Sequence, residues 1–192
     1  MASNCRHVVL TGPPGVGKTT LVQKIVSKLQ AKVVTCRGFY TQEVRQGGKR
    51  VGFDIITLDG KTGVLSRAKP DSGGNRRECR VGQYVVDVPG FESLALPLLR
   101  MQSTGPHILV LDEIGKMEMF SQEFVRGVRQ VISQPDMTLL LTIPIPKGKP
   151  IPLVEEIRSH PNNLVVNLTR DNRDDCDLHE KILKVLTTSL QK

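Results

Sequence analysis

A glycine-rich octamer near the start of the chain has the residue types and the spacing of a phosphate-binding loop. It fits the pattern G-x-x-x-x-G-K-[ST] and reads Gly12-Pro13-Pro14-Gly15-Val16-Gly17-Lys18-Thr19. The glycines allow the backbone to wrap closely, so that successive N–H groups can point at phosphate oxygens. We expect Lys18 to reach the β- and γ-phosphates of a nucleotide and the hydroxyl of Thr19 to ligate Mg²⁺. The octamer therefore predicts a nucleotide site that uses magnesium.

A pair of carboxylates in the middle of the chain could complete this chemistry. Asp112 and Glu113 directly follow the apolar run 109–111, which is the pattern of a Walker B element. We expect Asp112 to hold Mg²⁺, directly or through water, and Glu113 to orient and partly deprotonate an attacking water. Neighbouring residues of an extended segment point to opposite faces, so the two carboxylates should have different tasks. The alternative is a pair of solvated acids that end a strand.

The residues after these carboxylates extend the candidate site. Lys116 is close enough in sequence to Glu113 to supply a positive charge to the γ-phosphate, as an arginine finger does. It is equally well interpreted as a surface lysine that starts the next helix. Glu118 is expected in the first turn of that helix, in a structural role. The predicted nucleotide-binding residues are Gly12, Pro13, Pro14, Gly15, Val16, Gly17, Lys18, Thr19, Thr20, Leu111, Asp112, Glu113, Ile114, Gly115 and Lys116.

The predicted secondary structure gives these motifs the context that they require. Residues 7–10 are a short apolar run typical of a buried strand, and residues 20–29 have apolar positions at helical spacing. A helix that begins at the loop adds the positive potential of its N-terminus where phosphates would lie. Further apolar strands are predicted at 33–40, 107–111, 138–143 and 164–168, and further helices at 120–132 and 178–190. Apolar strands separated by helices indicate a mostly parallel sheet with helices on both faces.

The segment 43–88 differs from the rest of the chain. Turn signals at 46–49, 59–61 and 72–75 separate the strand-like runs 51–58 and 80–86. We interpret this segment as β-hairpins inserted into the parallel sheet. The predicted fold class is therefore an α/β P-loop fold that contains inserted hairpins.

Composition and charge limit the class of protein. The chain has 192 residues, 39% hydrophobic and 24% charged, which suits a single globular domain over residues 1–192. No apolar run is long enough to span a bilayer, and the first five residues do not resemble a signal peptide. The four cysteines are too widely spaced to suggest a disulfide framework or a zinc site. We expect a soluble, monomeric, cytoplasmic protein that has no membrane partner.

The net charge of +8 allows two interpretations. It could mark a nucleic-acid surface, or it could reflect a polyanion pocket together with scattered surface lysines. Aromatic residues make up only 4% of the chain and there is no Trp, so few side chains could stack on the bases of a single-stranded nucleic acid. Nucleoside triphosphates are the expected partners, and nucleic acid is not.

Five segments, in this order, resemble the cancer-related nucleoside-triphosphatase family, first known from thermophiles. They are residues 12–20, Gly38-Phe39-Tyr40-Thr41, Glu43-Val44-Arg45, Gly52-Phe53-Asp54 and Asp112-Glu113-Ile114-Gly115-Lys116-Met117-Glu118. The resemblance covers essentially the whole chain. It implies a P-loop core, Mg²⁺ dependence, and slow hydrolysis that accepts ATP, GTP, CTP and UTP.

Two other classes of function remain open. A nucleoside or small-molecule kinase would share the loop but would need an acceptor pocket, and the Glu113 that follows Asp112 favours water as the acceptor. A nucleic-acid-linked ATPase or a GTP switch is the other class. Residues 112–115 match the D-x-x-G of small GTPases, whereas residues 172–175 only approach their N-K-x-D motif.

Several weaker signals could belong to the site. Thr142 could sense the γ-phosphate, the loop 169–173 could contact a base, and Lys147 and Lys149 could touch phosphates. A rigid, proline-rich loop with two solvated lysines is favoured for the last pair. One of the hairpin arginines could close over the nucleotide, and the candidates are Arg45, Arg67, Arg76, Arg77 and Arg80.

Overall fold

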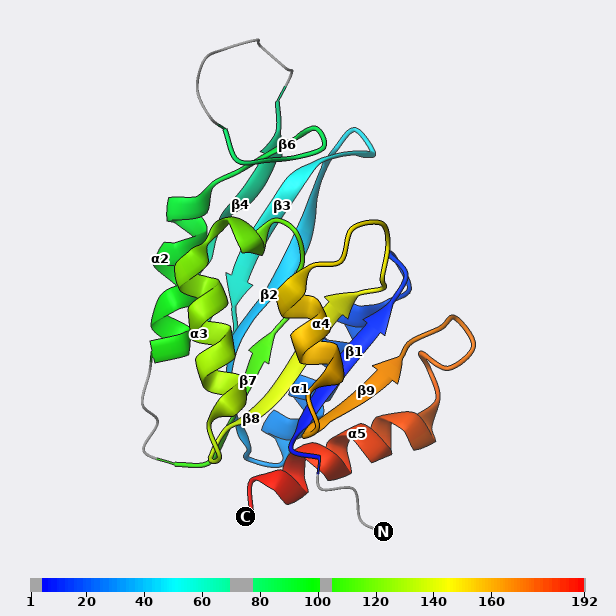
Figure 1. Ribbon diagram of the computed structural model, residues 1–192. Coiled ribbons are helices and arrows are strands. Elements are labelled where there is room, and N and C mark those ends of the chain that lie inside the picture. The colour runs from blue at the N-terminus through cyan, green and yellow to red at the C-terminus, as the bar shows by residue number, and fades with distance from the viewer. Residues whose placement is uncertain (1–4, 70–77, 101–104, 192) are drawn as a thin grey trace.

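A single sheet organises the molecule in the computed structural model, which describes residues 5–69, 78–100 and 105–191. Within these residues the sheet has nine strands in the order β5-β6-β4-β3-β2-β7-β8-β1-β9 (Figure 1). The strands are β1 (His7–Gly12), β2 (Thr35–Gln46), β3 (Lys49–Thr57), β4 (Thr62–Ala68), β5 (Arg80–Val81), β6 (Tyr84–Val86), β7 (His107–Leu111), β8 (Thr138–Pro144) and β9 (Asn163–Asn167).

The sheet has a parallel part and an antiparallel part. Strands β2, β7, β8, β1 and β9 are parallel neighbours, so that their carboxyl ends meet at one edge. Strands β3, β4, β6 and β5 continue the sheet beyond β2 with antiparallel pairing. The predicted parallel sheet with inserted hairpins is confirmed, and the hairpins extend the same sheet instead of forming a separate layer.

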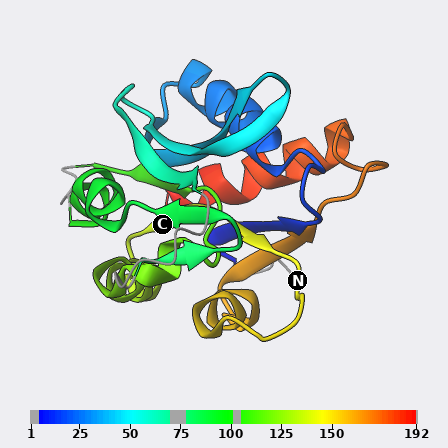
Figure 2. The ribbon, with the colours of Figure 1, turned by 90° about the horizontal axis from the view of Figure 1, so that it is seen from above.

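Helices cover both faces of the sheet, as Figure 2 shows. Helices α1 and α5 pack on one face against apolar side chains of β1 and β8, and α2, α3 and α4 cover the other face. The apolar core between the sheet and α2, α3 and α4 contains Phe91 and Phe124, whose ring centroids are 5.0 Å apart. The helices are α1 (Lys18–Ala31), α2 (Val88–Arg100), the 3₁₀ helix η1 (Glu118–Phe120), α3 (Gln122–Ser133), α4 (Pro152–Ser159) and α5 (Cys176–Ser189).

Two helices were not predicted, and both contain proline. In α2 the proline Pro97 lies inside the helix, and in α4 Pro152 is the first helical residue. Proline is tolerated in a first turn because the N–H there has no partner within the helix, whereas an internal proline normally argues against a helix. Packing of α2 against α3 and β4 overrides this local preference.

Some boundaries also differ from the prediction. The predicted helix 120–132 begins only at Gln122, after Ser121 caps it by accepting a hydrogen bond from the Phe124 backbone at 3.0 Å. Phe120, the first residue of the predicted helix, lies outside α3 and is exposed. The predicted turn 72–75, Arg76 and Arg77 lie outside the described residues. Among the helices of the described ranges, none combines the length and the apolar character that a bilayer crossing requires.

Candidate functional site

The predicted phosphate-binding loop joins β1 to α1 at the carboxyl edge of the parallel strands. Gly15 and Gly17 have φ angles of 72° and 108°, a conformation that favours glycine and that shapes the loop. The ammonium of Lys18 donates to the carbonyl oxygens of Gly12 at 3.0 Å and Pro13 at 3.3 Å. Partial burial lowers the pKa of Lys18, whereas Glu113 and Asp112 raise it. Lys18 thus lies across the loop, between its backbone and the two carboxylates.

Asp112 is fully buried beneath this loop. Its Oδ2 accepts a hydrogen bond from the Thr19 hydroxyl at 2.6 Å and one from the backbone N–H of Thr41 at 3.4 Å. Its Oδ1 accepts from the Thr142 hydroxyl at 2.7 Å. Burial raises the pKa of Asp112 to about 6, although the bonds from Thr19 and Thr142 lower it. The carboxylate is held in one orientation by three different elements.

The donor set at Asp112 and Thr19 fits Mg²⁺. This ion prefers oxygen ligands, and proteins usually hold it by one or two carboxylates together with substrate phosphates and water. The hydroxyl of Thr19 and the carboxylate of Asp112 already contact each other. Within the described residues there is no cluster of three or more His, Cys, Asp or Glu side chains of the kind that holds a metal without a substrate.

Glu113 leaves the strand in a different direction from Asp112. Strand β7 ends at Leu111, and Glu113 has a φ of 65°, so the prediction of an extended Asp-Glu pair is wrong. Its backbone N–H donates to the Thr142 hydroxyl at 2.7 Å, and its Oε2 accepts from the Thr41 hydroxyl at 2.9 Å. The two side chains nevertheless lie in different surroundings, because Asp112 is buried and Glu113 is exposed. A turn, and not the strand pleat, separates the two carboxylates.

A buried carboxylate holds the loop that follows Glu113 in place. The Glu118 carboxylate is 2% exposed, and its Oε2 accepts a hydrogen bond from the Gly115 backbone at 2.9 Å. Burial, and then the charge of Glu113, raises the pKa of Glu118 to about 8. Glu118 starts η1 and not α3, so its structural role is to hold this loop. Lys116 is exposed on the same loop.

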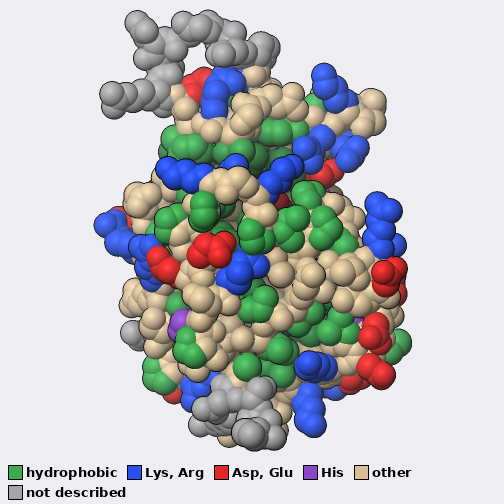
Figure 3. All heavy atoms as spheres, turned by 45° about the vertical axis from the view of Figure 1, so that its right-hand side comes forward, with side chains coloured by type: hydrophobic (Ala, Val, Ile, Leu, Met, Phe, Trp, Pro, Cys, Tyr) green, Lys and Arg blue, Asp and Glu red, His purple; other side chains and the backbone are tan. Residues whose placement is uncertain are grey.

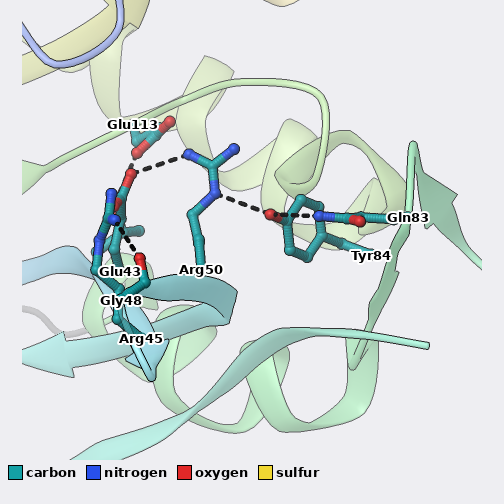
Figure 4. A network of polar contacts seen from close by, with 8 residues as sticks. Glu43, Arg45, Gly48, Arg50, Gln83, Tyr84 and Glu113 are labelled. Carbon is teal, nitrogen blue, oxygen red and sulfur yellow. Dashed lines mark hydrogen bonds and ion pairs between the residues drawn. The ribbon is translucent and has the colours of Figure 1, made fainter.

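Two residues near the site were missed as candidates, Thr41 and Arg50. The β2–β3 hairpin brings Arg50 to the site, where it donates to Tyr84 at 2.8 Å and to Glu43 at 2.9 Å (Figure 4). Its guanidinium lies 5.1 Å from the ring centroid of Phe53. Thr41 belongs to the G-F-Y-T segment, whose only signal in the sequence is the family resemblance. The register of the hairpin could not be read from the residues alone.

The comparisons with known proteins agree with this geometry. A family model described as NTPase matches residues 7–183. The chain belongs to this NTPase family. It is 57% identical to the human cancer-related nucleoside-triphosphatase over 173 residues, which cover 88% of this chain and 91% of the relative. It is also 42% identical to the nucleoside-triphosphatase THEP1 of Aquifex aeolicus over 174 residues, 87% of this chain and 92% of that one.

Solved structures support the same assignment of the fold. The solution structure of a human cancer-related nucleoside triphosphatase superposes with a TM-score of 0.83 at 52% identity and covers 96% of this NTPase and 99% of that chain. The crystal structure of THEP1 from Aquifex aeolicus gives a TM-score of 0.78 at 40% identity, and covers 94% and 98%. The predicted P-loop NTPase fold and the family resemblance are confirmed.

Most of the predicted site residues of this NTPase line two adjoining cavities, whereas Val16, Leu111, Asp112 and Ile114 are buried and line neither. One of about 460 Å³ is lined by Gly15, Gly17, Lys18, Thr19 and Thr20, together with Thr41, Arg50, Glu113 and Thr142. Lys116 does not line it. Lys116 lines a neighbouring cavity of about 850 Å³, together with Lys147 and Lys149. The structure therefore separates Lys116 from the Thr19 end of the loop.

The described hairpin arginines that were named as candidates have other partners. Arg45 pairs with Glu43, Arg67 with Asp54 and Arg80 with Glu78. None of the three lines the cavity that contains Thr19 and Glu113. Arg50 is the described hairpin arginine that does.

Side chains of residues 172–175, the segment that approaches the N-K-x-D motif, form hydrogen bonds to the nearby backbone. Asn172 Oδ1 accepts from the Thr169 backbone at 2.8 Å, and its Nδ2 donates to the carbonyl of Asn167 at 3.0 Å. Asp175 caps α5 by accepting from the Asp177 backbone at 2.9 Å. Within the protein itself, Asn172 is thus bonded through both ends of its amide, and Asp175 through one carboxylate oxygen.

Proposed function

We propose that this NTPase is a Mg²⁺-dependent phosphatase that hydrolyses ATP, GTP, CTP and UTP to the diphosphate and phosphate. One observation carries the proposal. Glu113 is exposed toward the phosphate-binding loop and accepts from Thr41 at 2.9 Å, while the neighbouring Asp112 is buried and bonded to Thr19 at 2.6 Å. This pairing supports a free base beside the γ-phosphate and a fixed metal ligand below it.

The proposed hydrolysis needs little covalent chemistry from the protein. Glu113 orients a water and accepts its proton as the water oxygen bonds to the γ-phosphorus and the bond to the β–γ bridging oxygen breaks. Lys18 neutralises charge on the β- and γ-phosphates. When Mg²⁺ is bound by Thr19 and Asp112, it supplies further positive charge to the phosphate oxygens. Positioning and charge therefore account for the catalysis.

A second cation is needed near the transferred phosphoryl group, and two side chains compete for the task. Arg50 lines the cavity that contains Lys18, Thr19 and Glu113, while Lys116 is exposed in the neighbouring one. Arg50 is also held by Tyr84 and Glu43, so that its guanidinium is already oriented. We propose that Arg50 stabilises the transition state and that Lys116 makes a smaller contribution from the far side of the γ-phosphate.

Loose base preference follows from what surrounds the nucleoside end of the loop. A cavity of about 270 Å³ is lined there by Thr20, Lys24, Arg173 and Asp174 among others. Charged side chains at a rim contact sugar and phosphate, whereas a base is selected by fixed donors and acceptors, and Asn172 and Asp175 are used internally. This supports acceptance of both purine and pyrimidine nucleotides.

One assay panel tests the proposal. Phosphate release is measured from the four ribonucleoside triphosphates, with Mg²⁺ or EDTA, for the wild type and for Lys18→Ala. We expect kcat/KM values within about tenfold of one another, or about 1.4 kcal/mol, and no turnover with EDTA or in the variant. A thousandfold preference for GTP, or wild-type turnover by Lys18→Ala, would contradict the proposal.

We also propose that the enzyme acts as a cytoplasmic monomer built from one domain over residues 1–192. A sheet that joins β5 at one edge to β9 at the other supports the single domain. Sedimentation at micromolar concentration should give one species of about 21.2 kDa. A dimer under these conditions would contradict the proposal.

A further inference from the structure

A large cavity adjoins the phosphate-binding site, and most of its wall has no task in the proposed hydrolysis. Its volume is about 850 Å³, within the range of small-molecule sites. It shares Pro14, Lys18, Phe53 and Glu113 with the cavity that contains Thr19. The remaining wall comes from Gly12 and Pro13, from β4 and β5, from the loop that contains Lys116 and from residues 144–155.

The order of the cavities along the loop shows which end of a nucleotide this one faces. Thr20 and Lys24 line the small cavity at the start of α1, on the side of the α-phosphate and the nucleoside. The large cavity instead touches Gly12 and Pro13 and none of Gly15, Gly17, Thr19 or Thr20. On the proposed placement of the triphosphate, this cavity therefore lies beyond the γ-phosphate and away from the base.

The wall of the cavity combines apolar surface with positive charge. Phe53, Leu65, Met117, Ile151 and Val154 supply the apolar part. In the space-filling view, Lys and Arg side chains form a band across the upper part of the molecule, with hydrophobic side chains on both sides of the band (Figure 3).

Besides the shared Lys18, and alongside the carboxylates of Glu113, Glu118 and Glu155, the cations of this wall are Lys116, Lys147 and Lys149. Within residues 5–69, 78–100 and 105–191, none of the three forms an ion pair. The buried Glu118 at the same wall adds little negative charge at neutral pH, because burial raises its pKa to about 8. Unpaired lysines beside an apolar wall suit a ligand that has both an anionic group and a ring.

We propose that this cavity is an acceptor site for a phosphorylated small molecule that carries a ring, with nucleoside monophosphates as the simplest case. The enzyme then transfers the γ-phosphoryl group to this acceptor as well as to water. This inference rests on the proposed placement of the γ-phosphate between Lys18 and Glu113.

The transfer balances without any further reactant. A phosphate oxygen of the acceptor bonds to the γ-phosphorus, and the bond between this phosphorus and the β–γ bridging oxygen breaks. The products are a nucleoside diphosphate from the donor and a second diphosphate from the acceptor. If the acceptor phosphate enters as the monoanion, its proton passes to the carboxylate of Glu113. Lys147 and Lys149 neutralise the charge that the acceptor brings.

The test uses ATP labelled at the γ-phosphate, with AMP, GMP, CMP and UMP offered in turn. Labelled nucleoside diphosphate is separated from labelled phosphate. We expect label in at least one diphosphate, together with a fall in phosphate release as acceptor replaces water. Free nucleosides are the neutral probe, and label in a nucleoside but in none of the monophosphates would overturn the anionic acceptor.

Two variants examine the cavity itself. The double variant Lys147→Glu and Lys149→Glu should lower transfer at least tenfold but leave phosphate release without acceptor within twofold. Ile151→Trp, which fills the cavity, should do the same. Lys184→Glu, an exposed lysine of α5 that is not in this wall, is the control and should retain both activities.

The two proposals can fail separately. Wild-type enzyme that releases phosphate but labels no monophosphate overturns the acceptor site and leaves hydrolysis intact. Transfer that is equal in the wild type and in both cavity variants also overturns it. Absence of both phosphate release and transfer contradicts the proposed hydrolysis as well.

Discussion

The hydroxyl of Thr142 lies 2.7 Å from the backbone nitrogen of Glu113 and accepts its hydrogen bond, although Thr142 belongs to β8 and Glu113 to the turn after β7. The same hydroxyl donates to Asp112 at 2.7 Å. The buried side chain of Thr142 thus helps to position both Asp112 and Glu113. Glu113 has a φ of 65°, a conformation that costs a residue with a Cβ on the order of 1–3 kcal/mol. The bond from Glu113 to Thr142 helps to hold this strained turn.

Replacing Thr142 by valine should therefore slow hydrolysis tenfold or more. The methyl group fills the space but leaves the Glu113 N–H and the Asp112 Oδ1 without this partner, and the free energy of unfolding should fall by about 1–3 kcal/mol. Thr142→Ser should restore most of the rate because it restores the hydroxyl. Single-turnover hydrolysis and urea unfolding measure the two effects.

Thr138→Val is the matched control, since Thr138 is a buried threonine of the same strand. It should leave the rate of hydrolysis within twofold of the wild type. Equal rates for the two valine variants would mean that Thr142 does not position the carboxylates.

Substitutions of the two carboxylates should have different effects on nucleotide binding and on the rate of hydrolysis. Glu113→Gln keeps the size and the contact with Thr41 but removes the base, so we expect nucleotide affinity within a few-fold and a fall in kcat of about 10² or more. Asp112→Asn should weaken Mg²⁺ dependence and nucleotide binding together. Nucleotide Kd and single-turnover rates are measured for both variants. Two variants that cannot be distinguished would rule out separate tasks.

The sequence was sufficient to locate the loop and both carboxylates because each lies in a short, contiguous motif. The octamer 12–19 and the pair Asp112 and Glu113 need only the strand before them to be interpreted. The mostly parallel sheet was predicted from continuous apolar runs that alternate with segments whose apolar residues recur at helical spacing. These features depend on local pattern, which a single sequence contains.

The missed features depend on contacts between distant segments. Arg50 lies opposite Arg45 in the paired strands β2 and β3, after a register shift between Val44 and Arg45 that no residue pattern indicated. The direction of Glu113 depends on Thr142, which lies on another strand. Helix α2 was hidden by Pro97, whose local preference is overridden by packing. Long-range pairing thus decides the details of the site.

Arg50 should affect the rate more than the affinity. Arg50→Ala removes a cation that lines the cavity with Lys18 and Glu113, and we expect kcat to fall by about 10² with nucleotide Kd changed only a few-fold. Arg45→Ala is the control, because Arg45 also pairs with Glu43 but does not line this cavity. If both variants lose the same activity, the loss comes from a less stable hairpin and not from the removal of a cation at the cavity. If Lys116→Ala shows the larger fall, the second cation is Lys116.

The pKa of Glu118 should make stability fall as the pH rises. Below about pH 4.5 this carboxyl is protonated in both the folded and the unfolded chain. Between 4.5 and its folded pKa of about 8, the unfolded chain ionises while the buried carboxyl keeps its proton. The free energy of unfolding then decreases by up to about 1.4 kcal/mol per pH unit from this group, and the decrease ends above the folded pKa.

Glu118→Gln isolates this contribution, because the amide oxygen can still accept from the Gly115 backbone but cannot ionise. Other titrating groups, Asp112 among them, affect both proteins and largely cancel in the difference between them. We expect the variant to gain stability relative to the wild type by a few kcal/mol between pH 5 and pH 8. Urea unfolding at half-unit steps measures it, with the exposed Glu123→Gln as a control whose difference should stay within about 1 kcal/mol. A difference for Glu118→Gln that stays constant over this range would mean that the carboxyl is ionised in the folded protein, and the raised pKa would then have to be abandoned.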